Sequence, residues 1–344
     1  MADDRTPVTR QALLDMMVTV RKTHILRAGV ELGVFDILAS GTSTAEAVAG
    51  KLGTDPRATR VLLNALAAIG LLDATDGGYL LAPGADTLLV ADSPEYYGHA
   101  FRLAASDYEW DALRHLPEAV RTGGTVVDDN AESPDFGYWL DFAVAGTGNT
   151  QPMADLIAEE VTTWAAGRDT LDVLDVACGH GLYGFTIAQR DPRARVWSLD
   201  WPNVLSITAA NAERLGVTDR SAQIPGDMFT APLGGPYDVI AVTNVLHHFS
   251  HERAVELLAR MRGALKPDGR LVTVAITHAG GPPAEDPVPH LFAVLMLAWT
   301  HSGEVTSAEE VAEIVAEAGF DTPSQHSLPH IPLRTFIADR RNES

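Results

Sequence analysis

The sequence predicts an α/β protein of two domains: a helical, winged-helix-like N-terminal domain and a Rossmann-like, doubly wound, mostly parallel sheet. Two observations support this fold class. Over residues 1–165, apolar positions recur mainly at helical spacing and are interrupted by a short hairpin pattern. Over residues 166–344, short apolar strands alternate with amphipathic helices, as in βαβ units. We therefore expect the domain boundary near residue 165.

The composition limits the classes of partner. The chain has 344 residues, of which 46% are hydrophobic and 21% charged, as is usual for a globular protein. Its formal net charge of -21 opposes binding to nucleic acid phosphates and docking on an anionic membrane. We find no apolar run of about 18 residues, the length that spans a bilayer, and no secretory signal. The single cysteine, Cys178, cannot form an intrachain disulfide. We expect a cytoplasmic protein.

Helices followed by a hairpin are expected in the N-terminal domain. Apolar residues at helical spacing run over residues 10–40, Ser43 or Thr44 can cap a second helix that Gly53 ends, and Asp55-Pro56 opens a third. Asp76-Gly77-Gly78 is typical of a hairpin turn. The third helix, residues 57–69, would read DNA in a winged helix, but it carries two arginines among many alanines and leucines. We interpret it as part of a dimerisation surface.

Residues 90–165 are expected to be helical and are rich in aromatic side chains. Packing between helices accounts for most of these rings. One cluster, formed by Phe136, Tyr138, Trp139 and Phe142, comes directly before the second domain. Such a cluster could line a pocket for a flat substrate.

The C-terminal domain is predicted from short apolar strands with helices between them. The strands are expected at residues 171–177, 194–200, 221–229, 237–246 and 270–277. Helices are expected at residues 185–191, 206–216 and 254–269. Because helices connect successive strands, the sheet should be mostly parallel and should bind its ligand at the carboxyl ends of the strands.

Acidic residues at successive strand ends indicate a nucleotide-like cofactor. Asp175 lies in the first strand, just before a turn that contains Gly179 and Gly181. Such a turn lets the backbone approach a ligand closely and presents N–H groups at a helix N-terminus. Asp200 ends the second strand, where a carboxylate can accept both hydroxyls of a ribose.

The third strand completes this signature. Asp227 ends it and can bind an adenine amino group, while Met228 and Phe229 cover the ring. The turn after the first strand runs from Ala177 to Gly181 and departs from the GxGxxG pattern that a nicotinamide dehydrogenase favours. A cationic sulfonium also suits a site with several carboxylates. We therefore predict S-adenosylmethionine as the cofactor. A doubly wound domain without a nucleotide is the less favoured interpretation.

The motifs LDVACGHG, LDWP, GDMF, LHHF and ALKPDGRLV, in this order, resemble those of class I methyltransferases. With its winged-helix first half and the late segment SGEVTSAEEVAEIVAEAGF, the chain is similar to plant and bacterial small-molecule O-methyltransferases that dimerise through their N-terminal domains. The resemblance covers residues 10–340. It implies bound S-adenosylmethionine, a homodimer and a hydrophobic small-molecule substrate. We assign Trp201 and Asn244 to the same cofactor site.

The resemblance also suggests a catalytic base. Members of this family typically carry His-Asp-Trp after the fourth strand, with the histidine as base. Here His247 occupies that position, and an imidazole suits removal of a phenolic proton. His248 replaces the aspartate, and Ala275 replaces one carboxylate that orients the base, whereas Glu304 retains the other. His247 could instead be a helix-capping or packing residue.

Further substrate contacts are expected from segments that the resemblance places around the acceptor. We assign to this group Trp139, Phe142, Met153, His248, Met296, Trp299 and His301. An alternative is a metal ion held by some of His247, His248, His290 and His301. Adjacent histidines cannot easily face one site, and no spacing matches a metal motif, so we assign no metal ligand.

Together these features predict methyl transfer from S-adenosylmethionine to a hydroxyl of an aromatic or polycyclic small molecule in natural product biosynthesis. Two alternatives stay open within enzymes. One is C-methylation, perhaps assisted by a metal, of a keto acid or enol. The other is a methyltransferase-like protein that keeps the cofactor for a different reaction, such as hydroxylation. A winged-helix protein that senses a ligand is the least favoured.

Overall fold

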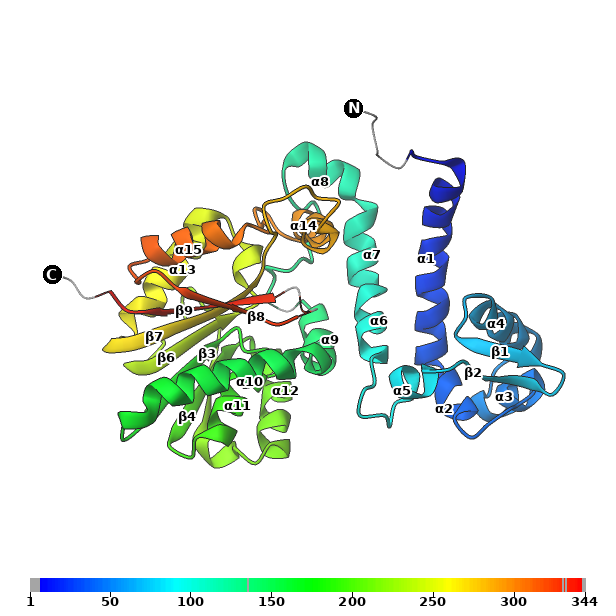
Figure 1. Cartoon of the computed structure of the whole chain (residues 1–344), viewed down its shortest axis with the longest axis horizontal. Helices are drawn as coiled ribbons and strands as arrows, with labels where there is room; N and C mark the ends of the chain where they lie inside the picture. The colour runs from blue at the N-terminus through cyan, green and yellow to red at the C-terminus, as the bar shows by residue number, and fades with distance from the viewer. Residues whose placement is uncertain (1–6, 135, 330, 332, 342–344) are drawn as a thin grey trace. The chain divides into compact units, whose positions relative to one another are not determined.

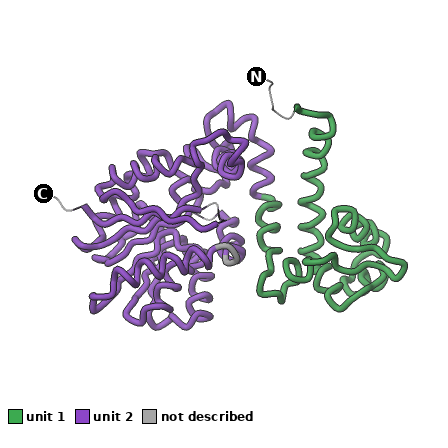
Figure 2. The backbone as a smooth tube through the Cα atoms, in the orientation of Figure 1, with its two compact units in different colours: residues 1–107 green, residues 108–344 purple. Residues whose placement is uncertain are grey.

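The structure is a computed structural model that describes residues 7–134, 136–329, 331 and 333–341. The chain forms two compact units, residues 1–107 and residues 108–344 (Figure 2). The sequence pattern predicts the boundary near residue 165, where the alternation of strands and helices begins. The structure divides the chain earlier, because the segment from residue 108 belongs to the second unit and its helix over residues 147–164 packs against the sheet.

The first unit consists of helices and a hairpin (Figure 1). Its elements are α1 (Arg10–Glu31), α2 (Val34–Leu38), α3 (Ala45–Leu52), α4 (Pro56–Ala68), β1 (Leu72–Thr75), β2 (Gly78–Leu81), α5 (Ala85–Leu89) and α6 (Gly98–Ala104). β1 and β2 pair antiparallel. This order confirms the expected helices followed by a two-stranded wing.

Local signals set the helix boundaries of the first unit. The side chain of Thr44 accepts a hydrogen bond from the N–H of Ala47 and caps α3, and Asp55 caps α4 through the N–H of Ala58. The single helix expected over residues 10–40 is divided, because Gly33 adopts a left-handed φ of 74° between α1 and α2.

Seven strands of the described chain form the sheet of the second unit. They are β3 (Leu171–Val176), β4 (Ala194–Asp200), β5 (Ser221–Pro225), β6 (Tyr237–Thr243), β7 (Leu265–Ile276), β8 (Ser324–Ser327) and β9 (Leu333–Asp339). Their order across the sheet is β5-β4-β3-β6-β7-β9-β8. The first five pair in parallel, and β9 pairs antiparallel with β7 and β8. The predicted doubly wound, mostly parallel sheet is thus confirmed.

Helices cover both faces of this sheet (Figure 1). One face packs against α10 (Thr147–Trp164), α11 (Leu182–Arg190) and α12 (Pro202–Arg214), and the other against α13 (His251–Gly263) and α15 (Ala308–Glu317). Neighbouring strand residues alternate between the two cores, since Val173 packs in the first and Leu174 in the second. α13 ends at Gly263, earlier than expected, because the following segment already belongs to β7.

The remaining helices of the second unit are α7 (Asp107–Arg114), α8 (Leu116–Thr122), α9 (Tyr138–Ala145) and α14 (Pro287–Trp299). Rings from α9 and α14 pack together, with the ring centroids of Tyr138 and Trp299 4.5 Å apart. This aromatic contact joins segments that lie far apart in the sequence and positions α9 beside the site described next. In the described part of the chain, no helix has both the length and the apolar character needed to cross a bilayer.

Candidate active site

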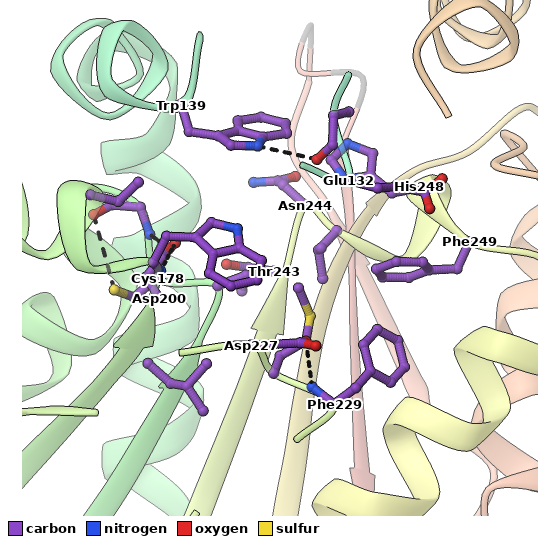
Figure 3. Close-up of a pocket in the computed structure, with 18 of the residues that line it drawn as sticks. Glu132, Trp139, Cys178, Asp200, Asp227, Phe229, Thr243, Asn244, His248 and Phe249 are labelled. Atoms are coloured by element: carbon purple, nitrogen blue, oxygen red, sulfur yellow. Dashed lines mark hydrogen bonds between the residues drawn. The ribbon is translucent and has the colours of Figure 1, made fainter. Parts of the chain in front are cut away.

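A cavity of about 530 Å³ lies at the carboxyl ends of the parallel strands (Figure 3). Ala177 follows β3, Asp200 ends β4, Gly226 follows β5 and Asn244 follows β6, and all of them line the cavity. The chain leaves β3 toward β4 and β5 on one side of the sheet and returns to β6 on the other. Doubly wound sheets bind ligands at such a switch point.

Asp200 is fixed in the cavity by two backbone donors. The N–H of Gly179 donates to Oδ2 at 2.8 Å, and the N–H of Trp201 donates to Oδ1 at 2.7 Å. Burial raises the pKa of the Asp200 carboxyl to about 6, against the opposing effect of these donors. Each carboxylate oxygen keeps a lone pair, so the group can accept hydrogen bonds from a vicinal diol such as a ribose.

Asp175 and Gly181 are predicted to bind the cofactor, but neither lines the cavity. Asp175 is fully buried, its Oδ2 accepts from the N–H of Gly184 at 3.1 Å, and burial raises its pKa to about 7. Gly181 has φ 75°, and a Cβ there would lie 2.4 Å from the Phe185 ring. Both residues therefore shape the turn and its packing on α11.

Asp227, Met228 and Phe229 line the cavity together, as predicted. The N–H of Phe229 donates to Asp227 Oδ1 at 2.8 Å, which fixes the carboxylate beside the ring. The guanidinium carbon of Arg253 lies 3.6 Å from the centre of the Phe229 ring, and Phe249 contacts the same ring edge-to-face at 5.1 Å. This flat apolar slot beside a hydrogen-bond acceptor suits an adenine.

The cavity therefore has a polar side, which we call the strand-end wall. It comprises Gly179, Asp200, Trp201, Asp227 and Phe229. The other side, which we call the aromatic wall, comprises Trp139, Phe142 and His248. Figure 3 shows the labelled Trp139 and His248 above Asp200 and Asp227.

Contacts between rings hold the aromatic wall in place. The Trp139 ring lies 5.3 Å from the His248 imidazole and 5.9 Å from the Phe142 ring. The indole N–H of Trp139 also donates to the carbonyl of Ala131 at 3.2 Å. The aromatic wall therefore presents an indole face with a fixed orientation, which is suited to a flat ligand.

The two adjacent histidines have different surroundings. Both belong to a short 3-10 helix, η3 (Leu246–His248), and their rings are perpendicular with centroids 4.7 Å apart. His248 lines the cavity, whereas His247 is not among its lining residues and contacts the Phe292 ring at 5.1 Å. Burial lowers the pKa of His248 to about 4 and that of His247 well below the usual value, the latter with a further contribution from His248. Both imidazoles are therefore neutral at pH 7.

Glu304 does not orient His247, contrary to the expectation from the sequence. Glu304 is exposed, and Nδ1 of His247 is buried without a hydrogen-bond partner among the described residues. Backbone packing occupies the space beside the histidines: a Cβ added to Gly303 would lie 2.5 Å from the His247 carbonyl oxygen. The loop after α14 thus meets η3 through its backbone.

Two predicted substrate contacts are core residues here. Met153 is fully buried against the sheet, and its sulfur accepts a hydrogen bond from the Thr335 hydroxyl at 2.9 Å. Met296 is also buried, and neither side chain lines the cavity. The prediction for Met153 is wrong because the register of α10 directs this residue toward the sheet rather than toward the ligand.

Trp299 and His301 also lie away from the cavity lining. Trp299 packs on Tyr138, and its indole N–H donates to the carbonyl of Tyr108 at 3.3 Å. His301 is exposed and pairs through Nδ1 with Oε2 of Glu132 at 3.1 Å. Since Glu132 does line the cavity, His301 reaches the site only through this carboxylate.

The four histidines of the metal hypothesis are not brought together. His301 pairs with Glu132, and the His290 ring stacks on His278 at 5.2 Å. Over the described ranges, no group of three or more histidine, cysteine or acidic side chains is arranged to hold a metal ion.

Several cavity residues are not among those predicted from the sequence. Tyr183 and Arg253 line the cavity from the first turns of α11 and α13, and His180 lies within the glycine turn. These residues lie within or next to the glycine turn, or next to the histidine pair, in the sequence. This proximity is the signal that could have identified them as cavity residues. Glu132 comes from a loop for which the sequence offered no signal.

The fold and cavity define a class I, S-adenosylmethionine-dependent methyltransferase. Residues 148–321 match the O-methyltransferase domain family, and residues 14–91 match the O-methyltransferase dimerisation domain. The chain belongs to the O-methyltransferase family and is an enzyme with S-adenosylmethionine as its cofactor. The residues present fit that cofactor, because Asp200 keeps free lone pairs and the buried amide oxygen of Asn244 has no partner among the described residues.

Similar proteins agree with this assignment. The chain is 31% identical to the acetylserotonin O-methyltransferase of Mus musculus, over 96% of this chain and 88% of that protein. It is 29% identical to the 3-amino-4-hydroxybenzoate 4-O-methyltransferase of Streptomyces cremeus, over 92% of this chain and 87% of the relative. A solved structure from Nostoc punctiforme, assigned to the O-methyltransferases, superposes with a TM-score of 0.88 at 29% identity, covering 97% of this chain and 100% of its own.

Proposed function

We propose that this enzyme methylates a hydroxyl of an aromatic or polycyclic small molecule, in natural product biosynthesis. The observation that carries the proposal is the aromatic wall, which faces the strand-end wall within one cavity. Asp200 and Asp227 would hold the cofactor at the strand-end wall, and the indole of Trp139 would hold a flat acceptor on the facing side of the same cavity.

The relatives support the same acceptor class. Those from Streptomyces species are named for methyl transfer to an aminohydroxybenzoate, to a hydroxynaphthoate and in mitomycin biosynthesis. These are aromatic or polycyclic compounds of secondary metabolism. The wall formed by Trp139 and Phe142 suits such compounds because it is apolar and flat.

The proton of the acceptor hydroxyl has to be removed by a group near the cavity. We propose an imidazole of η3: His247 occupies the position of the family's base, and the adjacent His248 lines the cavity. A neutral imidazole has one ring nitrogen free to accept a proton, and the low pKa values of both histidines keep them neutral at pH 7. The bound cofactor supplies an electrophilic methyl group and a positive charge that stabilises the phenolate.

Product analysis tests this function. The purified protein is incubated with S-adenosylmethionine and a panel of phenols, naphthols and hydroxyquinones, and S-adenosylhomocysteine is measured by chromatography. We expect S-adenosylhomocysteine together with a product in which one hydroxyl has become a methyl ether. A product that keeps all its hydroxyls and gains a C-methyl group would contradict O-methylation. A modified acceptor without S-adenosylhomocysteine would indicate a non-methylating reaction.

We also propose a symmetric homodimer formed through the first unit. α1 exposes large apolar side chains, among them Met16 at 68%, Met17 at 65% and Leu13 at 52%. Such a surface favours burial against a second copy. Light scattering should report a dimer, and Met17→Glu should shift it toward monomer. Val120→Glu, at a site 63% exposed in the second unit, is the matched control and should leave the dimer intact.

A further inference from the structure

Two polar side chains meet on the cavity lining between the glycine turn and the end of β6. Tyr183 lies in the first turn of α11, and its side chain is almost completely buried. Asn244 directly follows β6 and adopts φ 55°, a left-handed conformation that is uncommon outside glycine. Both residues line the cavity. Neither is explained by contacts to the adenine, the ribose or the acceptor.

The hydrogen bond between them leaves a donor and an acceptor unused. Nδ2 of Asn244 donates to the Tyr183 hydroxyl oxygen at 3.0 Å. Oδ1 of Asn244 is buried and has no partner among the described residues. The hydroxyl proton of Tyr183 likewise has no hydrogen-bond acceptor in the described part of the chain. Because unsatisfied buried polar groups are costly and rare, this pair points to a ligand that presents both an acceptor and a donor.

The sheet topology indicates which part of the cofactor reaches this pair. The adenine slot is at the end of β5, and Asp200, which suits the ribose, is at the end of β4. The order β5-β4-β3-β6 places the ends of β3 and β6 next along the same edge. A cofactor that extends along this edge therefore brings its amino-acid end to Tyr183 and Asn244. That end carries an α-ammonium donor and an α-carboxylate acceptor.

We infer that Tyr183 and Asn244 bind the amino-acid end of S-adenosylmethionine. Oδ1 of Asn244 accepts a hydrogen bond from the α-ammonium, and the Tyr183 hydroxyl donates to the α-carboxylate. Their mutual hydrogen bond fixes the spacing of the two groups. By holding this end, the pair sets where the sulfonium lies relative to the aromatic wall, so both are positioning residues.

The protonation state of Tyr183 agrees with this role. Burial raises the pKa of the Tyr183 hydroxyl to about 12, with a smaller contribution from the nearby Asp175 carboxylate. The hydroxyl is therefore a donor at neutral pH. The left-handed backbone of Asn244 fits as well, since strained conformations concentrate at ligand sites.

Calorimetry with matched ligands tests the inference without any acceptor. S-adenosylhomocysteine carries the amino-acid end, 5′-methylthioadenosine lacks it, and decarboxylated S-adenosylhomocysteine retains only the amine. Tyr183→Phe should weaken S-adenosylhomocysteine about tenfold, as loss of a charged hydrogen bond implies. It should leave the Kd values of the other two ligands unchanged.

Asn244→Gly tests the second residue, because glycine accepts the left-handed backbone. It should weaken both ligands that carry the amine and spare 5′-methylthioadenosine. Asp200→Ala is the control that should weaken all three ligands. Equal loss for all three ligands in either positioning variant would indicate a structural role and overturn the inference, as would unchanged binding of S-adenosylhomocysteine. Because no acceptor is present, failure of the acceptor proposal would leave these results unaffected.

Discussion

The two walls of the cavity differ in how they are built. In the strand-end wall, backbone donors fix the carboxylates, as the N–H groups of Gly179 and Trp201 do for Asp200. In the aromatic wall, rings fix one another, as His248 and Phe142 do for Trp139. The first wall recognises a ligand through charge and directed hydrogen bonds. The second recognises it through shape and apolar area.

The difference separates the cofactor from the acceptor. Substitutions in the strand-end wall would disturb the strand ends and the glycine turn. This wall is therefore restricted to one ligand. The aromatic wall comes from α9 and η3, and its rings can be exchanged without altering strand pairing. A fold of this kind can keep S-adenosylmethionine and change acceptors. If the comparison holds, substitutions on the two walls should affect different kinetic constants.

The largest effect is expected at the histidine pair. His247→Ala should lower kcat by about 10²–10⁴-fold, as expected for removal of a general base. His248→Ala should act mainly on the KM of the acceptor, because this imidazole lines the cavity. Steady-state kinetics of both variants, with calorimetry of S-adenosylhomocysteine as the control, would measure this. A larger loss of kcat for His248→Ala than for His247→Ala would identify His248, on the aromatic wall, as the base.

A smaller effect is expected at the strand-end wall. Asp200→Ala should weaken S-adenosylhomocysteine by about 1–3 kcal/mol, through loss of charge-assisted hydrogen bonds to the ribose. The KM of the acceptor, measured at saturating cofactor, should stay unchanged. Asp219→Ala, which removes an exposed carboxylate, is the matched control. Unchanged affinity in Asp200→Ala would remove this residue from the cofactor site.

At the aromatic wall, Trp139→Ala should raise the KM of the acceptor about tenfold through loss of a stacked ring. Trp139→Phe keeps a ring but loses the hydrogen bond to the Ala131 carbonyl, so its effect should be smaller. Steady-state kinetics of both variants would measure the KM of the acceptor. Equal weakening of acceptor and cofactor would mean that the two walls do not act independently.

The smallest effect concerns pH, to which the walls should respond in opposite directions. Burial holds the pKa of His248 at about 4, so below pH 6.5 the unfolded state binds more protons and stability falls as pH falls toward 4. Burial raises the pKa of Asp200 to about 6, so the cofactor-free protein loses stability as pH rises from about 3.8 toward 6.

Thermal melts of two variants separate these contributions. His248→Phe should reduce the loss of Tm between pH 7 and pH 5 by about 2–4 °C, the shift expected for about 1 kcal/mol in a domain of this size. Asp200→Asn should raise the Tm of the cofactor-free protein at pH 7 by a similar amount. A Tm profile of His248→Phe that parallels the unmodified protein would show that this histidine titrates normally.

The strand-end wall could be predicted largely from the sequence. Strands, glycine turn and strand-end carboxylates are local signals, and parallel topology brings successive strand ends to one edge. For this reason Asp200, Asp227 and Phe229, which the sequence predicts for one cofactor site, line the same cavity. The sequence predicts Gly181 in the cofactor site, but Gly181 does not line the cavity. A glycine in a turn can make room either for a ligand or for a neighbouring ring, and the sequence does not distinguish the two.

Which other residues line the site depends on tertiary structure alone. Met153 and Trp139 were equivalent candidates by sequence, and only the register of α10 and the fold of α9 directed one to the core and the other to the cavity. The pairing of Tyr183 with Asn244 spans 61 residues, and the sequence carries no pattern for it. Periodicity encodes which face of an element is buried. Which ring or polar atom meets a ligand depends on how separate elements pack, and no local pattern records that.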